Sequence, residues 1–371
     1  MYDTLMGDSA VGTTRDGGGL GRRPQQSAAA VTPPVVAEAP RSPAHQPTAG
    51  FLHELACAAA GSRTADWQAK LDWVESLRAV AVPPAGRVGG VAAAAAAGGG
   101  GDAAAASAAA ICARAASCPD AAARLAWLRH RDYTADAAAA QEAVRTGNAA
   151  ALTYLLDEAG VRLGEDLSPV RAAAQGGKLE VLRALRSRRL WMDPYIVALA
   201  AAAHGHLPVV QWAVQELGAS VREGRLKTAA ASSGSVELMA WLQDTWGCRW
   251  TEDAFAASAG SGCEEAVEWL AENGCPMGTN GQPYNSAVGN NDLAVLRCLA
   301  RLGCPWGASG GAIFACCLRE PCKPLPLLRG LVEAGCPVDW QAAVDAASRQ
   351  GSAVPAEIWH WLVDEMRHRQ H

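Results

Sequence analysis

The sequence predicts an all-α chain: a solenoid of repeated short helix pairs that follows a disordered N-terminal segment. One observation is a residue pair, often Trp-Leu, whose second member recurs every 27 to 32 residues from Leu128 to Leu362. A second is a glycine or asparagine turn ahead of each pair, and a third is Gly-Cys or an equivalent behind it. Self-similarity with a period of roughly 20–50 residues is the signature of a solenoid.

Four segments follow one another along the chain. Residues 1–50 are mainly Gly, Pro, Ser and Ala with scattered charges, so they cannot bury enough apolar surface and are predicted to be disordered. Residues 51–82 carry a helical pattern that the Pro83-Pro84 pair ends, and they are interpreted as a degenerate helical repeat. Residues 83–108 are interpreted as a flexible Ala/Gly low-complexity insert, and residues 109–371 as the regular repeat array.

Residues 226–250 show why one repeat should form two helices. The alanine run at 229–231 predicts a short helix whose small side chains let neighbouring helices approach closely. Gly234 then allows positive φ at a sharp turn, and apolar residues at helical spacing predict a second, longer helix that ends at Gly247. Cys248 is expected to tuck back into the stack, and the recurrent tryptophans are expected to pack between repeats.

Residues 202–220, AAAHGHLPVVQWAVQELGA, resemble the ankyrin repeat. The resemblance rests on two adjacent alanines, on Gly205-His206 and the aliphatic residues after it, and on Gly218-Ala219. The Thr-Pro-Leu-His element that opens ankyrin helices is absent, and the spacing is a few residues short, so the chain resembles a divergent subtype with tight loops. The resemblance implies that His206 caps the turn between helices by bonding the backbone.

Composition and charge exclude several classes of protein. The net charge of −5 and the lack of a basic stripe disfavour nucleic acid and anionic membranes as partners. No stretch is apolar enough to cross a bilayer, and the N-terminus has no apolar signal region. We therefore expect an intracellular monomer, in the cytoplasm or nucleus by default, whose 12 cysteines are free thiols.

The sequence contains none of the motifs that would carry catalysis. It has no phosphate-binding Gly-Lys-Ser/Thr loop, no Gly-x-Ser-x-Gly elbow and no His-Glu-x-x-His, so we expect no enzyme activity and no cofactor. Cys316, Cys317 and Cys322 are interpreted as structural, because they lack zinc-ligand spacing, and no metal site is expected. The arginines at 183, 186, 188 and 189 are interpreted as a solvated outer face, with a phosphate or acidic contact as the alternative.

The resemblance to ankyrin repeats implies a non-catalytic scaffold that binds a partner protein through its concave face and loop tips. Eight side chains are expected there by position: Arg222, Glu223, Arg249, Glu252, Asp253, Thr279, Asn280 and Tyr284. One alternative is a substrate-receptor subunit of a ubiquitin ligase, with residues 51–82 in the place of an F-box but without its Leu-Pro opening. The other alternative is a metal-binding protein that uses the clustered cysteines.

Overall fold

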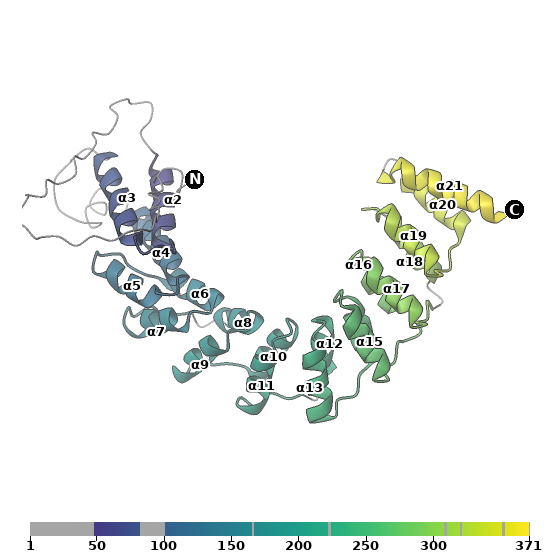
Figure 1. The fold of residues 1–371 in the computed structure, drawn as a ribbon, viewed down its shortest axis with the longest axis horizontal. Helices are drawn as coiled ribbons and strands as arrows, with labels where there is room; N and C mark the ends of the chain where they lie inside the picture. Colours follow the sequence, from purple (N-terminus) through teal and green to yellow (C-terminus); the bar gives the residue numbers. More distant parts are fainter. Residues whose placement is uncertain are drawn as a thin grey trace, which may run out of the picture. The chain divides into compact units, whose positions relative to one another are not determined.

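The computed structural model describes residues 48–81, 101–164, 167–221, 224–307, 310–319, 321–350 and 353–370. Within these ranges the chain forms twenty α-helices and no strand, which confirms the prediction of an all-α chain (Figure 1). The chain divides into two compact units, Met1–Ala139 and Ala140–His371. Most of the N-terminal segment predicted to be disordered, residues 1–47, lies outside the described residues.

The first unit contains two helix pairs and the start of α6. Its helices are α2 (Ala49–Ala60), α3 (Trp67–Ala81), α4 (Gly101–Ala116), α5 (Ala121–Arg129) and the beginning of α6 (Ala137–Thr146). Helix α2 contacts both α3 and α4, and α4 contacts α5. At the centre of this unit, Trp67 packs edge-on against Trp127 with ring centroids 4.9 Å apart. The buried Arg124 guanidinium lies over the Trp67 ring and donates to the Ala60 carbonyl oxygen.

The insert predicted over residues 83–108 overlaps a helix. Residues 82–100 lie outside the described residues, but α4 begins at Gly101, so residues 101–108 are helical. Ala108 and Ala109 are both buried in the first unit. Alanine is the strongest helix former, so a run of alanines that can pack against a neighbour becomes a helix in spite of its low complexity.

The second unit contains helix pairs in unbroken succession. After α6, its helices are α7 (Ala149–Asp157), α8 (Ser168–Gln175), α9 (Leu179–Ser187), α10 (Pro194–Ala202), α11 (Leu207–Gln215), α12 (Gly224–Ser232), α13 (Val236–Trp246), α14 (Glu252–Ala259), α15 (Glu264–Glu272), α16 (Gln282–Gly289), α17 (Leu293–Arg301), α18 (Gly310–Cys317), α19 (Leu325–Glu333), α20 (Trp340–Gln350) and α21 (Ala356–Gln370). Even-numbered helices open each pair and odd-numbered helices close it; we call them first and second helices.

Contacts in the second unit follow one rule. Each first helix from α8 onward contacts its own second helix and the first helix of the next pair. Second helices contact one another in the same sense, as α13 contacts α15 and α15 contacts α17. Among the described residues, no helix is long and apolar enough to span a membrane.

Small side chains allow the close approach of first helices. Ala143, Ala173, Ala201, Ala230 and Ala287 stand four residues before successive turns and are all fully buried. We call these positions, together with Ser258 in α14, the alanine column. Because alanine adds little volume, the backbones of adjacent first helices can lie close together.

The turn glycines take the predicted conformation. Gly147, Gly177, Gly205, Gly234 and Gly262 all have positive φ, between 67° and 81°. Asn291 has a φ of 58° at the corresponding place. A second set of left-handed residues ends the second helices, where Gly247 is the C-cap of α13, as the sequence predicts. The local structure of each helix pair therefore follows from two residues that tolerate positive φ.

Each turn glycine in the first repeats of this unit is covered by the next pair. A Cβ atom on Gly147 would lie 2.7 Å from the Lys178 side chain, and one on Gly177 would lie 2.7 Å from the His206 ring. Gly234 stands in the same relation to Cys263, at 2.8 Å from its Cβ atom. The covering residue is in each case the N-cap of a second helix. His206 also places Nε2 2.7 Å from the Gln175 carbonyl oxygen, and so bonds the backbone of the preceding pair.

Candidate interaction surface

The first helices expose one face along the second unit. In α12, the outward positions at helical spacing are Arg225, Thr228, Ala229 and Ser232, opposite the buried Leu226 and Ala230. Alignment on the turn glycines places Asp253 of α14 at the position of Arg225. We call this set of positions on successive first helices the outward column. Most of these positions are exposed or half-buried, because packing between helices uses mainly the opposite face of each first helix; Ala256 of α14 is buried.

The loops that lead into the first helices lie at one end of the outward column. Arg249, Glu252 and Asp253 are all exposed at the junction of α13 and α14. The Arg249 carbonyl oxygen accepts a hydrogen bond from Lys227 Nζ at 3.0 Å, which ties this loop to α12. These three predicted residues therefore belong to one patch with both signs of charge.

The next two loops fit closely together. Thr279 and Asn280 are exposed between α15 and α16, and Asn280 Oδ1 accepts from the Gln282 backbone N–H at 3.0 Å. A Cβ atom on Gly307 would lie 2.5 Å from the Thr279 carbonyl oxygen, and one on Gly281 would lie 2.2 Å from the Trp306 carbonyl oxygen. Both glycines have positive φ. Because the two backbones lie this close together, the loop that carries Thr279 and Asn280 is tightly packed against the loop that follows α17.

Tyr284 is a correction to the predicted surface. The sequence places it among the exposed loop positions, but its side chain is fully buried. Its ring stacks on the Trp306 indole with centroids 3.4 Å apart, and its hydroxyl donates to the Cys304 carbonyl oxygen at 3.0 Å. Burial also raises the pKa of the phenol. Tyr284 belongs to the first turn of α16 rather than to the loop before it, and its side chain is on the buried face of that helix.

The remaining two predicted residues, Arg222 and Glu223, lie outside the described residues. The structure thus brings Arg249, Glu252 and Asp253 together in one patch and exposes Thr279 and Asn280 in the following loop. The two groups are neighbours, because Gly278 of the second loop packs against Glu252: a Cβ atom placed on Gly278 would lie 3.0 Å from Glu252 Oε2.

Sequence reasoning overlooked an exposed tryptophan in this row of loops. Trp191 lies in the loop before α10 and is 70% exposed, the largest value among the exposed large apolar side chains. Its position corresponds to Arg249 two pairs later, because each stands two residues after a left-handed residue, Arg189 or Gly247. A tryptophan at a position that prolines or arginines occupy in most other repeats was the available signal.

The cysteines lie mainly inside the stack. Cys275, Cys304 and Cys336 are buried, and the backbone N–H of each donates to the carbonyl oxygen five residues earlier. Burial raises the pKa of the Cys275 and Cys304 thiols to about 11 and that of Cys336 to about 12. Thiols in this environment stay protonated at neutral pH and are poor nucleophiles and ligands.

The other cysteines give no grouping typical of a metal centre. All twelve cysteines are free thiols, and Cys316 is the exposed one. Among the described residues, no three His, Cys, Asp or Glu side chains gather as a metal ion would require.

The second helices carry ion pairs between neighbouring pairs. Arg188 donates two hydrogen bonds to the Asp157 carboxylate, at 2.8 and 2.5 Å. Arg186 lies 3.4 Å from Glu216, and Arg301 pairs with Glu268. Part of the arginine cluster predicted as a solvated outer face is therefore neutralised by carboxylates of adjacent helices. Exposed pairs of this kind contribute about 0–1 kcal/mol each.

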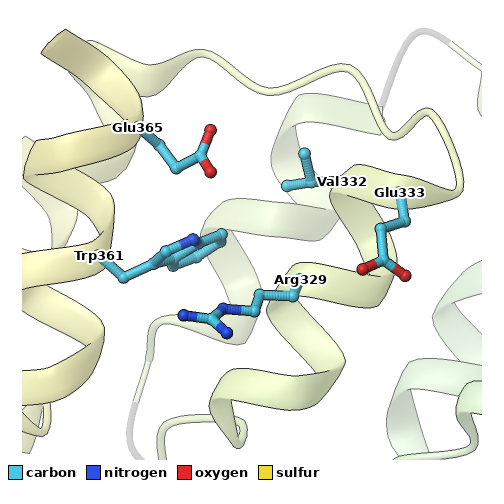
Figure 2. Close-up of a pocket in the computed structure, with 5 residues that line it drawn as sticks. All are labelled: Arg329, Val332, Glu333, Trp361 and Glu365. Atoms are coloured by element: carbon cyan, nitrogen blue, oxygen red, sulfur yellow. The ribbon is translucent and has the colours of Figure 1, made fainter. Parts of the chain in front are cut away.

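A hollow of about 240 Å³ lies between α19 and α21 (Figure 2). Its walls are Arg329, Val332 and Glu333 of α19 and Trp361 and Glu365 of α21. Figure 2 shows the Arg329 guanidinium and the Glu365 carboxylate on either side of the Trp361 indole.

Both carboxylates at this hollow already have arginine partners. Arg297 lies 3.3 Å from Glu333, and Arg369 lies 3.2 Å from Glu365. The five lining residues include no histidine, cysteine or serine, so the hollow lacks a base-and-nucleophile pair. The hollow is a gap between two second helices, α19 and α21.

Comparison of this chain with models of protein families and with curated proteins finds no match.

Proposed function

We propose that this chain is a non-catalytic interaction scaffold, built as an ankyrin-type solenoid, that binds a partner protein along its outward column and loops. The exposure of Arg249, Glu252, Asp253, Thr279 and Asn280 on consecutive repeats is the observation that carries the proposal. Side chains in such a row can vary without disturbing the core, because the helix pairs are held together by other residues. An extended row of this kind suits the recognition of another macromolecule better than the enclosure of a small substrate.

The packing of the first unit bears on the ubiquitin-ligase alternative. Helices α2 and α3 contact each other and α2 contacts α4, the rule that relates helix pairs in the second unit. This favours interpreting α2–α3 as a further repeat rather than as an adaptor-binding motif. The metal-binding alternative is weakened at Cys317 of the clustered cysteines, because burial of this thiol raises its pKa to about 12.

The test is affinity purification with the full chain, followed by identification of the proteins recovered. The double variant Arg249→Glu/Asp253→Arg should lose capture of the specific partner, because each exposed charge then faces its own sign on the partner. The circular dichroism spectrum should be unchanged, since neither side chain is part of the core.

A matched control reverses two exposed charges on the second helices, as Glu265→Arg/Arg297→Glu. This control should capture the partner as the unmodified chain does. Equal capture by the Arg249/Asp253 variant, or loss in the control alone, would place the interface elsewhere.

A further inference from the structure

Helix α10 differs from its neighbours in the outward column. Its outward positions are Ile196, Leu199, Ala200 and Ala203, all partly or fully exposed to solvent. We call these four residues the α10 apolar stripe. A surface helix of a globular protein normally carries polar side chains at such positions, and a helix that is apolar all round is normally buried.

Three of the four corresponding positions on each neighbouring helix are polar or basic, and the fourth is alanine. Helix α8 contacts α10 on one side and presents Arg171 where α10 has Leu199. Helix α12 contacts α10 on the other side and presents Arg225 where α10 has Ile196. The apolar stripe is thus bordered by an arginine on each side. Both arginines are exposed, and neither makes an ion pair with a described residue.

Trp191 is a second exposed apolar side chain, in the loop that leads into α10. It stands three residues before the helix and is 70% exposed. Tryptophan and arginine are the residues most enriched among those that dominate binding energy, typically at the centre of an interface. At α10, an exposed tryptophan, an aliphatic stripe and two flanking arginines therefore occur together.

The charge of this region is opposite to that of the chain. In the described loops and first helices from residue 161 to 232, omitting α9 and α11, the basic side chains are Arg162, Arg171, Lys178, Arg188, Arg189, Arg225 and Lys227. The acidic side chains there are Asp193 and Glu216. Asp193 Oδ1 accepts from the Tyr195 and Ile196 backbone N–H groups as the N-cap of α10, and Glu216 pairs with Arg186 of α9. Glu165, Asp166 and Glu223 belong to loop residues outside the described ranges. The chain as a whole has a net charge of −5, so this is a local reversal.

We propose that the α10 apolar stripe and Trp191 bind a partner-protein segment whose bulky apolar side chains are flanked by carboxylates. The inference deepens the proposed function and rests on it. The apolar anchor fills the stripe, and the flanking carboxylates pair with Arg171 and Arg225. A phosphodiester backbone would satisfy the arginines but leave the isoleucine and leucine without a role, so a peptide segment fits this surface better than a nucleic acid.

The experiment selects binders from a random 12-residue peptide library displayed on phage, using the full chain as the target. The expected peptides combine Leu, Ile, Phe or Trp with Asp or Glu. Trp191→Ala should weaken their binding at least about 30-fold, as expected for removing a central tryptophan anchor. Trp246→Ala is the matched control, because Trp246 is also exposed but ends a second helix, and it should leave binding unchanged.

A specificity switch separates recognition from a general loss of structure. Arg171→Glu/Arg225→Glu should select peptides that carry Lys or Arg beside the same apolar residues, because the surface charge is reversed while the stripe remains. Arg319→Glu/Arg349→Glu makes the same change in net charge on exposed arginines elsewhere and should keep the acidic preference.

Several outcomes would overturn the proposal. Selected peptides that bind Trp191→Ala unchanged but fail on Arg249→Glu/Asp253→Arg would remove the α10 stripe while keeping the proposed scaffold. Self-association of the full chain that Trp191→Ala abolishes would assign the stripe to a second copy. Retention of a labelled oligouridine that Arg171→Glu/Arg225→Glu abolishes would assign it to nucleic acid. No peptide enrichment and no protein partner would remove both proposals together.

Discussion

One buried hydroxyl interrupts the alanine column of the first helices. Ser258 is fully buried in α14, at the place that alanine occupies in α6, α8, α10, α12 and α16. Its Oγ atom has no hydrogen-bond partner among the described residues. A buried polar group without a partner loses its hydration and gains nothing in return, at a cost of about 1–3 kcal/mol.

Ser258→Ala should therefore stabilise the chain, by about 1 kcal/mol. The measurement is the midpoint of urea unfolding at constant slope, which should move to higher urea concentration. The reverse change two helices earlier in the chain, Ala230→Ser, is the matched comparison and should lower the midpoint. A Ser258→Ala chain no more stable than the unmodified one would mean that the hydroxyl is satisfied by water.

Tyr284 shows which features of a loop the sequence pattern predicts and which it does not. The sequence locates the loop between α15 and α16, since Gly-Cys-Pro ahead of a new helix marks it. It does not show that the helix begins at Gln282 or that the Tyr284 ring stacks on Trp306, a contact between successive repeats. Whether a side chain at a loop boundary is exposed depends on the residue at which the helix begins. The repeat spacing predicts that residue only to within a few positions.

At the scale of the element, the turn glycine of one helix pair packs against the N-cap residue of the second helix in the next pair. Gly160 and Gly177 have nearly the same φ, 70° and 67°. A Cβ atom would meet nothing within 4 Å at Gly160, but would meet the His206 ring at 2.7 Å at Gly177. The two sites separate the cost of backbone conformation from the cost of packing between pairs.

Gly160→Ala should cost only the left-handed conformation, about 1–2 kcal/mol. Gly177→Ala should cost about 1–3 kcal/mol more, because the ring must move and its bond to the Gln175 carbonyl oxygen is strained. Urea unfolding of both variants measures the difference. His206→Ala should remove most of the excess in the Gly177→Ala background, and an excess that survives would contradict this pairing.

The elements were predictable where chain conformation alone decides them. The turn glycines and the C-cap at Gly247 follow from the need for positive φ, and the structure confirms them. The start of α4 was not predictable, because an alanine run becomes a helix only where a neighbour covers it. The apolar composition of α10 was visible in the segment PYIVALAAA, which has no charged residue, but only the structure shows that its outer positions are partly exposed rather than buried.

At the scale of the whole molecule, buried thiols set the response to alkaline pH. Burial raises the pKa of five cysteines to between about 11 and about 12: Cys112, Cys275, Cys304, Cys317 and Cys336. A cysteine in an unfolded chain has a pKa of about 8.5. Above that pH the unfolded chain releases protons that the folded chain retains. The stability that these groups contribute is thus fully present below about pH 8.5 and is lost as the pH rises toward 11–12.

Unfolding free energy should therefore fall from pH 8.5 to 9.5, by up to about 1.4 kcal/mol per pH unit for each such thiol. Urea midpoints at pH 7.5, 8.5 and 9.5 in the presence of a reductant measure the fall. Cys304→Ala/Cys336→Ala should reduce the steepness, because two of the titrating groups are gone. Equal steepness in both chains would assign the alkaline loss to other groups.

The match between a turn glycine and the N-cap of the following pair also bears on how such a chain can change in length. Each covering contact joins a helix pair only to its immediate neighbour, at Gly147 and Lys178, at Gly177 and His206, and at Gly234 and Cys263. A duplicated pair brings its own glycine and its own N-cap, so both new junctions repeat contacts that already exist. Gain or loss of whole pairs by recombination leaves the junction geometry intact, whereas a shift of a few residues breaks it at two places. A change in the length of such a chain is therefore accommodated most easily when it adds or removes one complete helix pair.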